Sequence, residues 1–214
     1  MDEETSIIDT NTRNEKIKNF LIKNKKILIA SIISLILIVI GFYSYQMYKN
    51  GQRVKISNQY NNAIIEYQKG DKSKIILNLK DVINKKDSSY SPLALYFLID
   101  NKLIDDRDEI NTLFDVLISK TPLEIEIKNL IIFKKALFNA DEINEIELLN
   151  ILNPLINSDS VWKPHALYLV AEFFYSKGEI EKSKDFFQKI VLIENVNTEI
   201  AIKAQRRLNR DLSD

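Results

Sequence analysis

The pattern of hydrophobic and polar positions divides the chain into one long apolar run and a series of shorter periodic segments. The run Ile27–Tyr48 contains no charged residue. As an α-helix it would be roughly 33 Å long, slightly more than the hydrocarbon core of a bilayer. A helix satisfies its backbone hydrogen bonds internally, so this run can cross lipid without a partner. The sequence therefore predicts a transmembrane helix over residues 27–48.

Two other interpretations fit the apolar run less well. A buried core helix rarely stays apolar on all of its faces over such a length. A cleavable signal peptide has an apolar region of about 7–15 residues that ends in small residues. Here the run is longer and continues into Gly41-Phe42-Tyr43-Ser44-Tyr45. We therefore expect an uncleaved anchor.

Lysine and arginine are more frequent before the apolar run than after it. Six of them lie between residues 13 and 26, and three lie over a similar distance after Tyr48. The more basic flank stays in the cytoplasm, so the sequence predicts a cytoplasmic tail over residues 1–26 and a domain over residues 49–214 on the far side. In a Gram-negative bacterium this arrangement is a single-pass inner-membrane protein with a periplasmic domain.

Beyond the membrane segment, apolar residues recur with the period of an amphipathic helix, and the segments come in pairs. Four glycines and four prolines argue against an all-β fold, which needs frequent turns. Helix starts are predicted at Ser91-Pro92, Thr121-Pro122, Asp141-Glu142 and Lys163-Pro164, and Asn153-Pro154 should break or kink the helix that contains it. The predicted helices are residues 60–67 and 75–83, 91–98 and 110–118, 121–138 and 141–152, 163–177 and 181–193, and 198–212.

These pairs predict an all-α fold in which about four helix pairs stack as an α-solenoid and end in a C-terminal capping helix. Proline marks the first helix of three successive pairs, at Pro92, Pro122 and Pro164. The two intervals between these prolines bracket the periods of helical-hairpin repeats. Each pair has an apolar face too wide to bury alone, so the pairs are expected to stack.

The fourth pair, His165–Ile190, has the most specific pattern. It combines large residues, small residues and a turn glycine at regular positions: Leu167, Phe174 and Phe187; Ala171 and Ser183; and Gly178. In this pattern it resembles a tetratricopeptide repeat, in which the small positions allow the two helices to approach closely. The other three pairs have isoleucine or leucine at several small positions and are degenerate.

The whole arrangement resembles the YfgM-like family, the ancillary subunits of the bacterial Sec translocon. The resemblance covers about residues 15–212 and is most specific at Trp162, in the fourth pair, and in the segment Ile200–Leu208. It implies association with the SecYEG channel and with a membrane-anchored periplasmic prolyl-isomerase-like chaperone. It also implies that the protein has no enzymatic activity.

The residues offer little that could support catalysis or a cofactor. His165 is the single histidine and the chain has no cysteine, so neither a zinc site nor a nucleophile–base pair can be assembled from the usual residues. The acidic segment Asp105–Glu109 lacks the alternating ligands and central glycine of a calcium loop, and a solvated turn is favoured. The four glycines are isolated, which excludes a phosphate-binding loop. A membrane-anchored hydrolase or transferase is the enzyme-class alternative, but no catalytic set is visible for it.

Charge also argues against a nucleic-acid partner, and no small-molecule substrate is expected. The chain has 30 basic and 30 acidic side chains, so no overall basic field attracts nucleic acid. We interpret Arg206, Arg207 and Arg210 as the solvent-exposed side of the capping helix. The expected partners are therefore membrane lipid, around the apolar run, and other proteins.

The expected binding surface is the concave side of the solenoid, formed by the first helices of the pairs. Aromatic residues there could line a peptide groove or pack between repeats, and the sequence leaves these two roles open; Trp162 is interpreted as a packing residue. The sequence predicts a non-enzymatic, membrane-anchored scaffold at the Sec translocon that links it to periplasmic chaperones. The alternative is a membrane tether for another envelope process, such as cell division or envelope assembly. The aromatic candidates are Tyr60, Tyr67, Tyr96, Phe133, Trp162 and Tyr168.

Overall fold

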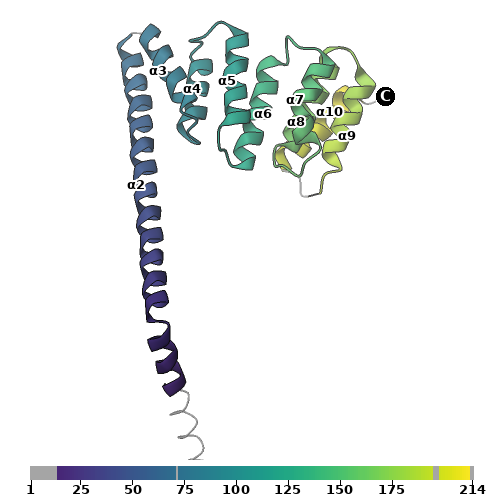
Figure 1. The fold of residues 1–214 in the computed structure, drawn as a ribbon. Helices are drawn as coiled ribbons and strands as arrows, with labels where there is room; N and C mark the ends of the chain where they lie inside the picture. The colour runs from purple at the N-terminus through teal and green to yellow at the C-terminus, as the bar shows by residue number, and fades with distance from the viewer. Residues whose placement is uncertain (1–13, 71, 195–197, 213–214) are drawn as a thin grey trace, which may run out of the picture. The chain divides into compact units, whose positions relative to one another are not determined.

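The computed structural model of the protein describes residues 14–70, 72–194 and 198–212. These residues form helices and turns, and no strand occurs among them (Figure 1). The chain divides into two compact units, Met1–Lys55 and Ile56–Asp214. We call residues 56–214 the repeat domain. The prediction of an all-α protein is confirmed.

The longest helix is α2 (Lys25–Lys69), which follows a helical segment over residues 14–23. It contains the whole apolar run, and it is the one described helix that is long and apolar enough to cross a membrane, judged by length and composition. Gly70 ends it with φ +102°, a conformation that glycine adopts without strain. The predicted membrane boundaries at residues 27 and 48 lie inside this helix and stay predictions.

Within the repeat domain, the end of α2 and the next seven helices form four pairs, and α10 follows as the cap. Figure 1 shows α3 to α9 standing side by side in chain order. The second helices of the pairs begin at Lys72, Arg107, Glu145 and Ile180, so their spacing stays close to the tetratricopeptide period of about 34 residues. The helices are α3 (Lys72–Asn84), α4 (Tyr90–Asp100), α5 (Arg107–Lys120), α6 (Ile125–Asn139), α7 (Glu145–Ile156), α8 (Lys163–Ser176), α9 (Ile180–Val191) and α10 (Thr198–Asp211).

The hydrophobic core is continuous from pair to pair. One cluster extends from Ala63 in α2 to Ile131 in α6, a second joins α6, α7 and α8, and a third joins α8, α9 and α10. The first two clusters take buried residues from neighbouring pairs, and the third joins the fourth pair to the cap. No pair therefore buries its apolar face alone, and stacking is what stabilises the domain.

Two of the predicted helix starts, at Thr121-Pro122 and Asp141-Glu142, are wrong, and so is the predicted cap at Ser91, although α4 begins within one residue of it. Ser91 is not an N-cap: it lies inside α4, is fully buried, and donates a hydrogen bond from Oγ to the carbonyl of Val82 in α3 at 2.9 Å. The carboxylate of Asp87 accepts from the backbone N–H groups of Ser89 and Tyr90 instead. Thr121 ends α5, and its Oγ1 donates to the carbonyl of Val116.

The other wrong start is Asp141-Glu142. Helix α7 begins at Glu145, after the N-cap Asn144, which forms a capping box with Glu147 in which each side chain accepts the other's backbone N–H. Pro154 does not end this helix at once, because α7 continues to Ile156. The start at Lys163-Pro164 is confirmed, with Pro164 in the first turn of α8, where its missing N–H removes no helical hydrogen bond.

Candidate functional site

The two N-terminal aromatic candidates lie between first helices of neighbouring pairs. Tyr60 in α2 lies 5.8 Å from the ring of Tyr90, and Tyr67 lies edge-on 5.1 Å from Phe97 in α4. Both tyrosines are half-buried and pack against the first core cluster. Burial raises the pKa of Tyr60 above its ordinary value. These rings therefore stack the first pair on the second.

Tyr96 continues this arrangement from α4 to α6. The ammonium of Lys134 lies 4.9 Å from the centre of its ring, a cation–π contact between consecutive first helices. The hydroxyl of Tyr96 is buried and has no hydrogen-bond partner among the described residues. Burial first, and the negative charge of Asp100 second, raise the pKa of this phenol far above its ordinary value. The group stays neutral and cannot act as a base at physiological pH.

Three aromatic side chains meet between α6 and α8. Phe133 stacks on Trp162 with ring centres 5.9 Å apart, and His165 lies 5.3 Å from Trp162 and 6.0 Å from Phe133. All three are half-buried. Burial lowers the pKa of His165, so the neutral imidazole is favoured. The structure thus brings Phe133 and Trp162 together, while Tyr60, Tyr67, Tyr96 and Tyr168 contact other residues.

The residues of the predicted repeat signature lie at the contact between α8 and α9. Leu167, Ala171, Phe174, Ser183 and Phe187 are all buried. Tyr168 packs edge-on against Phe187 at 5.2 Å, so it joins the two helices of one pair and not two first helices. Small side chains at 171 and 183 leave room for these larger rings.

Gly178 forms the turn between α8 and α9. Its φ is +76°, its N–H bonds to the carbonyl of Tyr175, and the N–H of Glu179 bonds to the carbonyl of Phe174. This is the Schellman arrangement, which needs a left-handed residue at this position. Lys102 adopts the same conformation after α4, with φ +49°. The sequence pattern could not show this turn because lysine does not mark a left-handed conformation.

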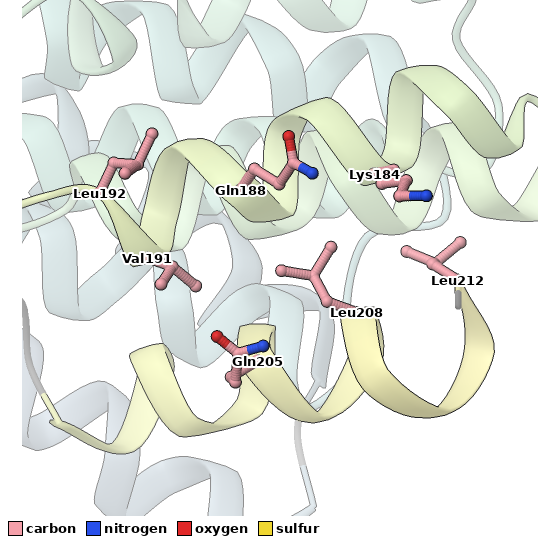
Figure 2. Close-up of a pocket in the computed structure, with 7 residues that line it drawn as sticks. All are labelled: Lys184, Gln188, Val191, Leu192, Gln205, Leu208 and Leu212. Atoms are coloured by element: carbon pink, nitrogen blue, oxygen red, sulfur yellow. The ribbon is translucent and has the colours of Figure 1, made fainter. Parts of the chain in front are cut away.

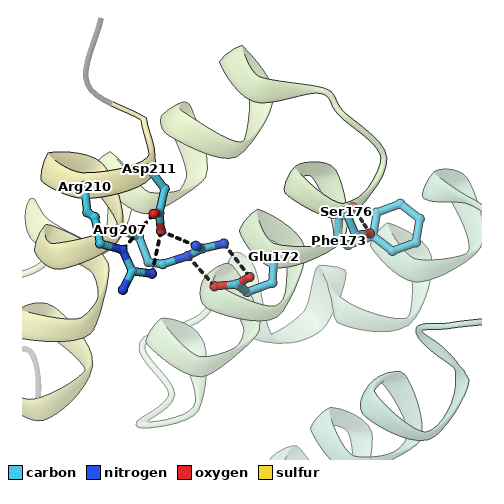
Figure 3. A network of polar contacts seen from close by, with 6 residues as sticks. All are labelled: Glu172, Phe173, Ser176, Arg207, Arg210 and Asp211. Atoms are coloured by element: carbon cyan, nitrogen blue, oxygen red, sulfur yellow. Dashed lines mark hydrogen bonds and ion pairs between the residues drawn. The ribbon is translucent and has the colours of Figure 1, made fainter.

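Arg207 was placed wrongly by the sequence pattern, which put it on the exposed side of α10. Its side chain is 15% exposed and reaches α8, where Nε and Nη2 each donate to the carboxylate of Glu172 at 2.8 Å (Figure 3). It also pairs with Asp211, and the hydrogen bond from Arg210 lowers the pKa of that carboxyl. In Figure 3, Ser176 lies apart from this network and bonds to the carbonyl of Phe173.

A signal for Arg207 was present in the helical period. Residues 200, 204 and 207 fall on one face of a helix, and Ile200 and Ala204 are buried there. Arginine on a buried face is best explained by a carboxylate partner, which Glu172 supplies.

The acidic segment before α5 has a structural role. The carboxylate of Asp106 accepts hydrogen bonds from the backbone N–H groups of Asp108 and Glu109 and so caps the helix. Across the described residues, no group of three or more histidine or acidic side chains is placed to hold a metal ion. The chemistry that these residues present is apolar contact, hydrogen bonding and charge.

Regularly spaced helix pairs, a shared core and a long apolar N-terminal helix define a tetratricopeptide-like helical protein. In agreement, residues 18–104 match the family described as tetratricopeptide repeat-like domain. The match includes the apolar run and the first pair, and it ends before the pair in which the repeat signature is clearest. No curated protein and no solved structure matches the chain.

Proposed function

We propose that this protein is a membrane-anchored, non-enzymatic scaffold whose repeat domain binds other proteins. The observation that carries the proposal is the exposure of the apolar run in α2, where Leu35 is 62% and Ile38 is 66% exposed. Helices of the repeat domain bury an apolar face against their neighbours, whereas this run presents apolar groups on every side. So large an apolar surface is favourable in lipid and unfavourable in water.

Helix α2 also supports an anchor over a cleaved leader. It is continuous for 45 residues, from Lys25 through the apolar run to Lys69. The run is longer than the apolar region of a signal peptide, and no A-x-A-like cleavage site follows it. The excess of basic residues before the run supports a cytoplasmic N-terminus and, in a Gram-negative bacterium, a periplasmic repeat domain.

The finer proposal is an ancillary subunit of the Sec translocon that links SecYEG to a membrane-anchored, prolyl-isomerase-like chaperone. Its support is the resemblance in architecture to the YfgM-like family, together with the tetratricopeptide-like fold. The anchor would hold the repeat domain beside membrane partners and raise their effective concentration. Affinity would come from apolar and aromatic side chains of the first helices, not from covalent chemistry.

Cross-linking of the full chain in native membranes tests both levels of this proposal. A photoactivatable residue replaces Leu93 in α4 or Ile127 in α6, which are exposed on first helices, and Ile146 in α7 serves as the matched position on a second helix. Translocon or chaperone subunits cross-linked from 93 and 127 but not from 146 are the expected result. Cross-links only to division or envelope-assembly proteins would reject the Sec assignment and favour the alternative tether.

The membrane orientation has its own test. A reporter enzyme active only outside the cytoplasm is fused to the C-terminus, and the membranes are washed at alkaline pH. We expect an active reporter that stays in the membrane fraction. An inactive reporter contradicts the orientation, and release of the protein by the wash contradicts the anchor.

A further inference from the structure

The last two helices leave an open apolar groove between them. It has a volume of about 630 Å³, and its lining comes from both helices (Figure 2). We call it the α9–α10 groove and define it by Val191, Leu192, Leu208 and Leu212, with Lys184 and Gln188 beside them. We propose that this groove binds an amphipathic helix of a partner protein, whose apolar stripe is flanked by carboxylates.

Two of the four apolar lining residues are accessible to a partner, whereas Leu212 is buried and Leu208 packs against the third core cluster. Val191 is 38% and Leu192 is 80% exposed. Single exposed leucines are common on protein surfaces, but several apolar residues around one groove mark a contact surface. A groove between two packed helices is also the shape that receives the ridge of a third helix.

Charge around the groove identifies the partner further. Among the described residues no carboxylate lines the groove, and Arg206 and Arg210 lie on the adjoining face of α10 beside Ile202. Arg210 pairs with Asp211, but Arg206 is exposed and makes no ion pair with any described residue. A partner with glutamate or aspartate beside its apolar stripe is therefore complementary, and a basic one is repelled.

Two other occupants fit the same groove less well. A second copy of this chain, related by a two-fold axis, would bring the cationic rims together, which is unfavourable. A membrane surface is flat and receives a protruding apolar face, whereas this surface is hollowed. The partner helix remains the occupant that both the shape and the charge favour.

The inference rests on the proposed scaffold function, and a direct binding experiment tests it separately. Because the chain has no cysteine, Gln188→Cys provides one unique thiol in the groove for a polarity-sensitive dye. The full chain is placed in nanodiscs of zwitterionic lipid. The probe is a synthetic peptide of about 16 residues, long enough to populate a helix, with a leucine stripe flanked by glutamates.

We expect a saturable blue shift of the dye, with a dissociation constant on the order of micromolar, as is typical of small transient interfaces. The same dye at Asp141→Cys, an exposed position outside the groove, should not respond. Arg206→Glu should weaken binding of the glutamate peptide about tenfold and strengthen binding of a peptide with lysines in their place. Circular dichroism checks that this exposed substitution leaves the fold unchanged.

Four results would refute the proposal that the α9–α10 groove binds a partner helix. Two concern the peptides: the absence of a saturable shift, and equal binding of the two peptides to the unsubstituted chain. The third is a shift that rises with protein concentration without peptide, and the fourth is quenching of the dye when the nanodiscs are instead prepared with brominated anionic lipid. The third would indicate a second copy as the occupant and the fourth a membrane surface. If first-helix positions still cross-link partners in native membranes, the groove is rejected and the scaffold function stands.

Discussion

Replacement of Arg207 by alanine should release α10 from α8 and leave the preceding pairs intact. The guanidinium makes two parallel hydrogen bonds of 2.8 Å to Glu172 and lies 4.2 Å from the ring centre of Tyr175. The remaining attachment of α10 is apolar: Ile200 and Ala204 within the helix and Leu212 directly after it are buried in the third core cluster. The polar network of Arg207 adds to this contact.

The size of the free-energy loss in Arg207→Ala follows from the solvent exposure of Arg207 and Glu172. Hydrogen bonds to charged groups contribute about 1.5–3 kcal/mol, whereas solvent-exposed ion pairs contribute about 0.2–1 kcal/mol. The side chain of Arg207 is 15% exposed and that of Glu172 is 36% exposed, so water screens the pair in part. We expect a loss of about 1–2 kcal/mol, which increases the local opening constant of α10 by about 5- to 30-fold.

Hydrogen exchange of the full chain, followed by mass spectrometry of fragments, measures this opening. Amides of α10 should exchange faster in Arg207→Ala by that factor, and amides of α4 should not change. Arg207→Lys retains the charge but cannot form the two parallel hydrogen bonds, so an intermediate effect is expected. Arg206→Ala is the matched control, because Arg206 is exposed on the same helix. The reasoning is refuted if the two alanine variants exchange alike, or if α4 opens as much as α10.

Three further predictions concern the fourth pair, one of them in comparison with the turn after α4. Phe187 is fully buried, so Phe187→Ala should lower the free energy of unfolding by about 3–5 kcal/mol in urea titrations of the chain in micelles. Gly178→Ala should lower the free energy of unfolding by about 1–2 kcal/mol, because alanine is strained at a φ of +76°. Lys102→Gly should raise the free energy of unfolding, because glycine adopts a φ of +49° without strain. Changes of the same sign in the two variants would contradict this reasoning. Burial lowers the pKa of His165 in the folded protein, so the unfolded chain binds a proton at this imidazole more tightly than the folded chain does. The stability contributed by neutral His165 is therefore complete above pH 6.5 and is lost as the pH falls. The fluorescence of Trp162, the only tryptophan and 5.3 Å away, should report a midpoint below 6.5 that disappears in His165→Gln.

Agreement between the sequence and the structure is best where the signal is local. The apolar run, the pairing of helices, the turn at Gly178 and the start at Pro164 were all predicted, because each depends on residues within a few positions of one another. The cap at Ser91 and the starts at Thr121 and Asp141 were wrong for a related reason. A serine or threonine that looks like a cap can instead bond to another carbonyl, as Ser91 does with Val82.

The repeat period was also obscured by local features. The prolines at 92, 122 and 164 suggested one short and one long interval, because Pro122 lies in the loop before α6 and not in its first turn. The second helices of the pairs recur more regularly, from α3 through α5 and α7 to α9. What recurs is the packing of pairs against each other, and proline marks it only indirectly.

The sequence by itself determined that this chain is helical, that its helices come in pairs, and that one helix is apolar on every side, because hydrophobic periodicity and length are properties of short segments. Only the tertiary structure decided that Tyr60, Tyr67 and Tyr96 contact neighbouring first helices, and that Arg207 is held by Glu172. Those partners lie far apart in the sequence, and which side chains meet across such a separation depends on how the helices stack. Periodicity shows that a residue belongs to a face of its helix, and the packing of that face against a particular neighbour decides its role.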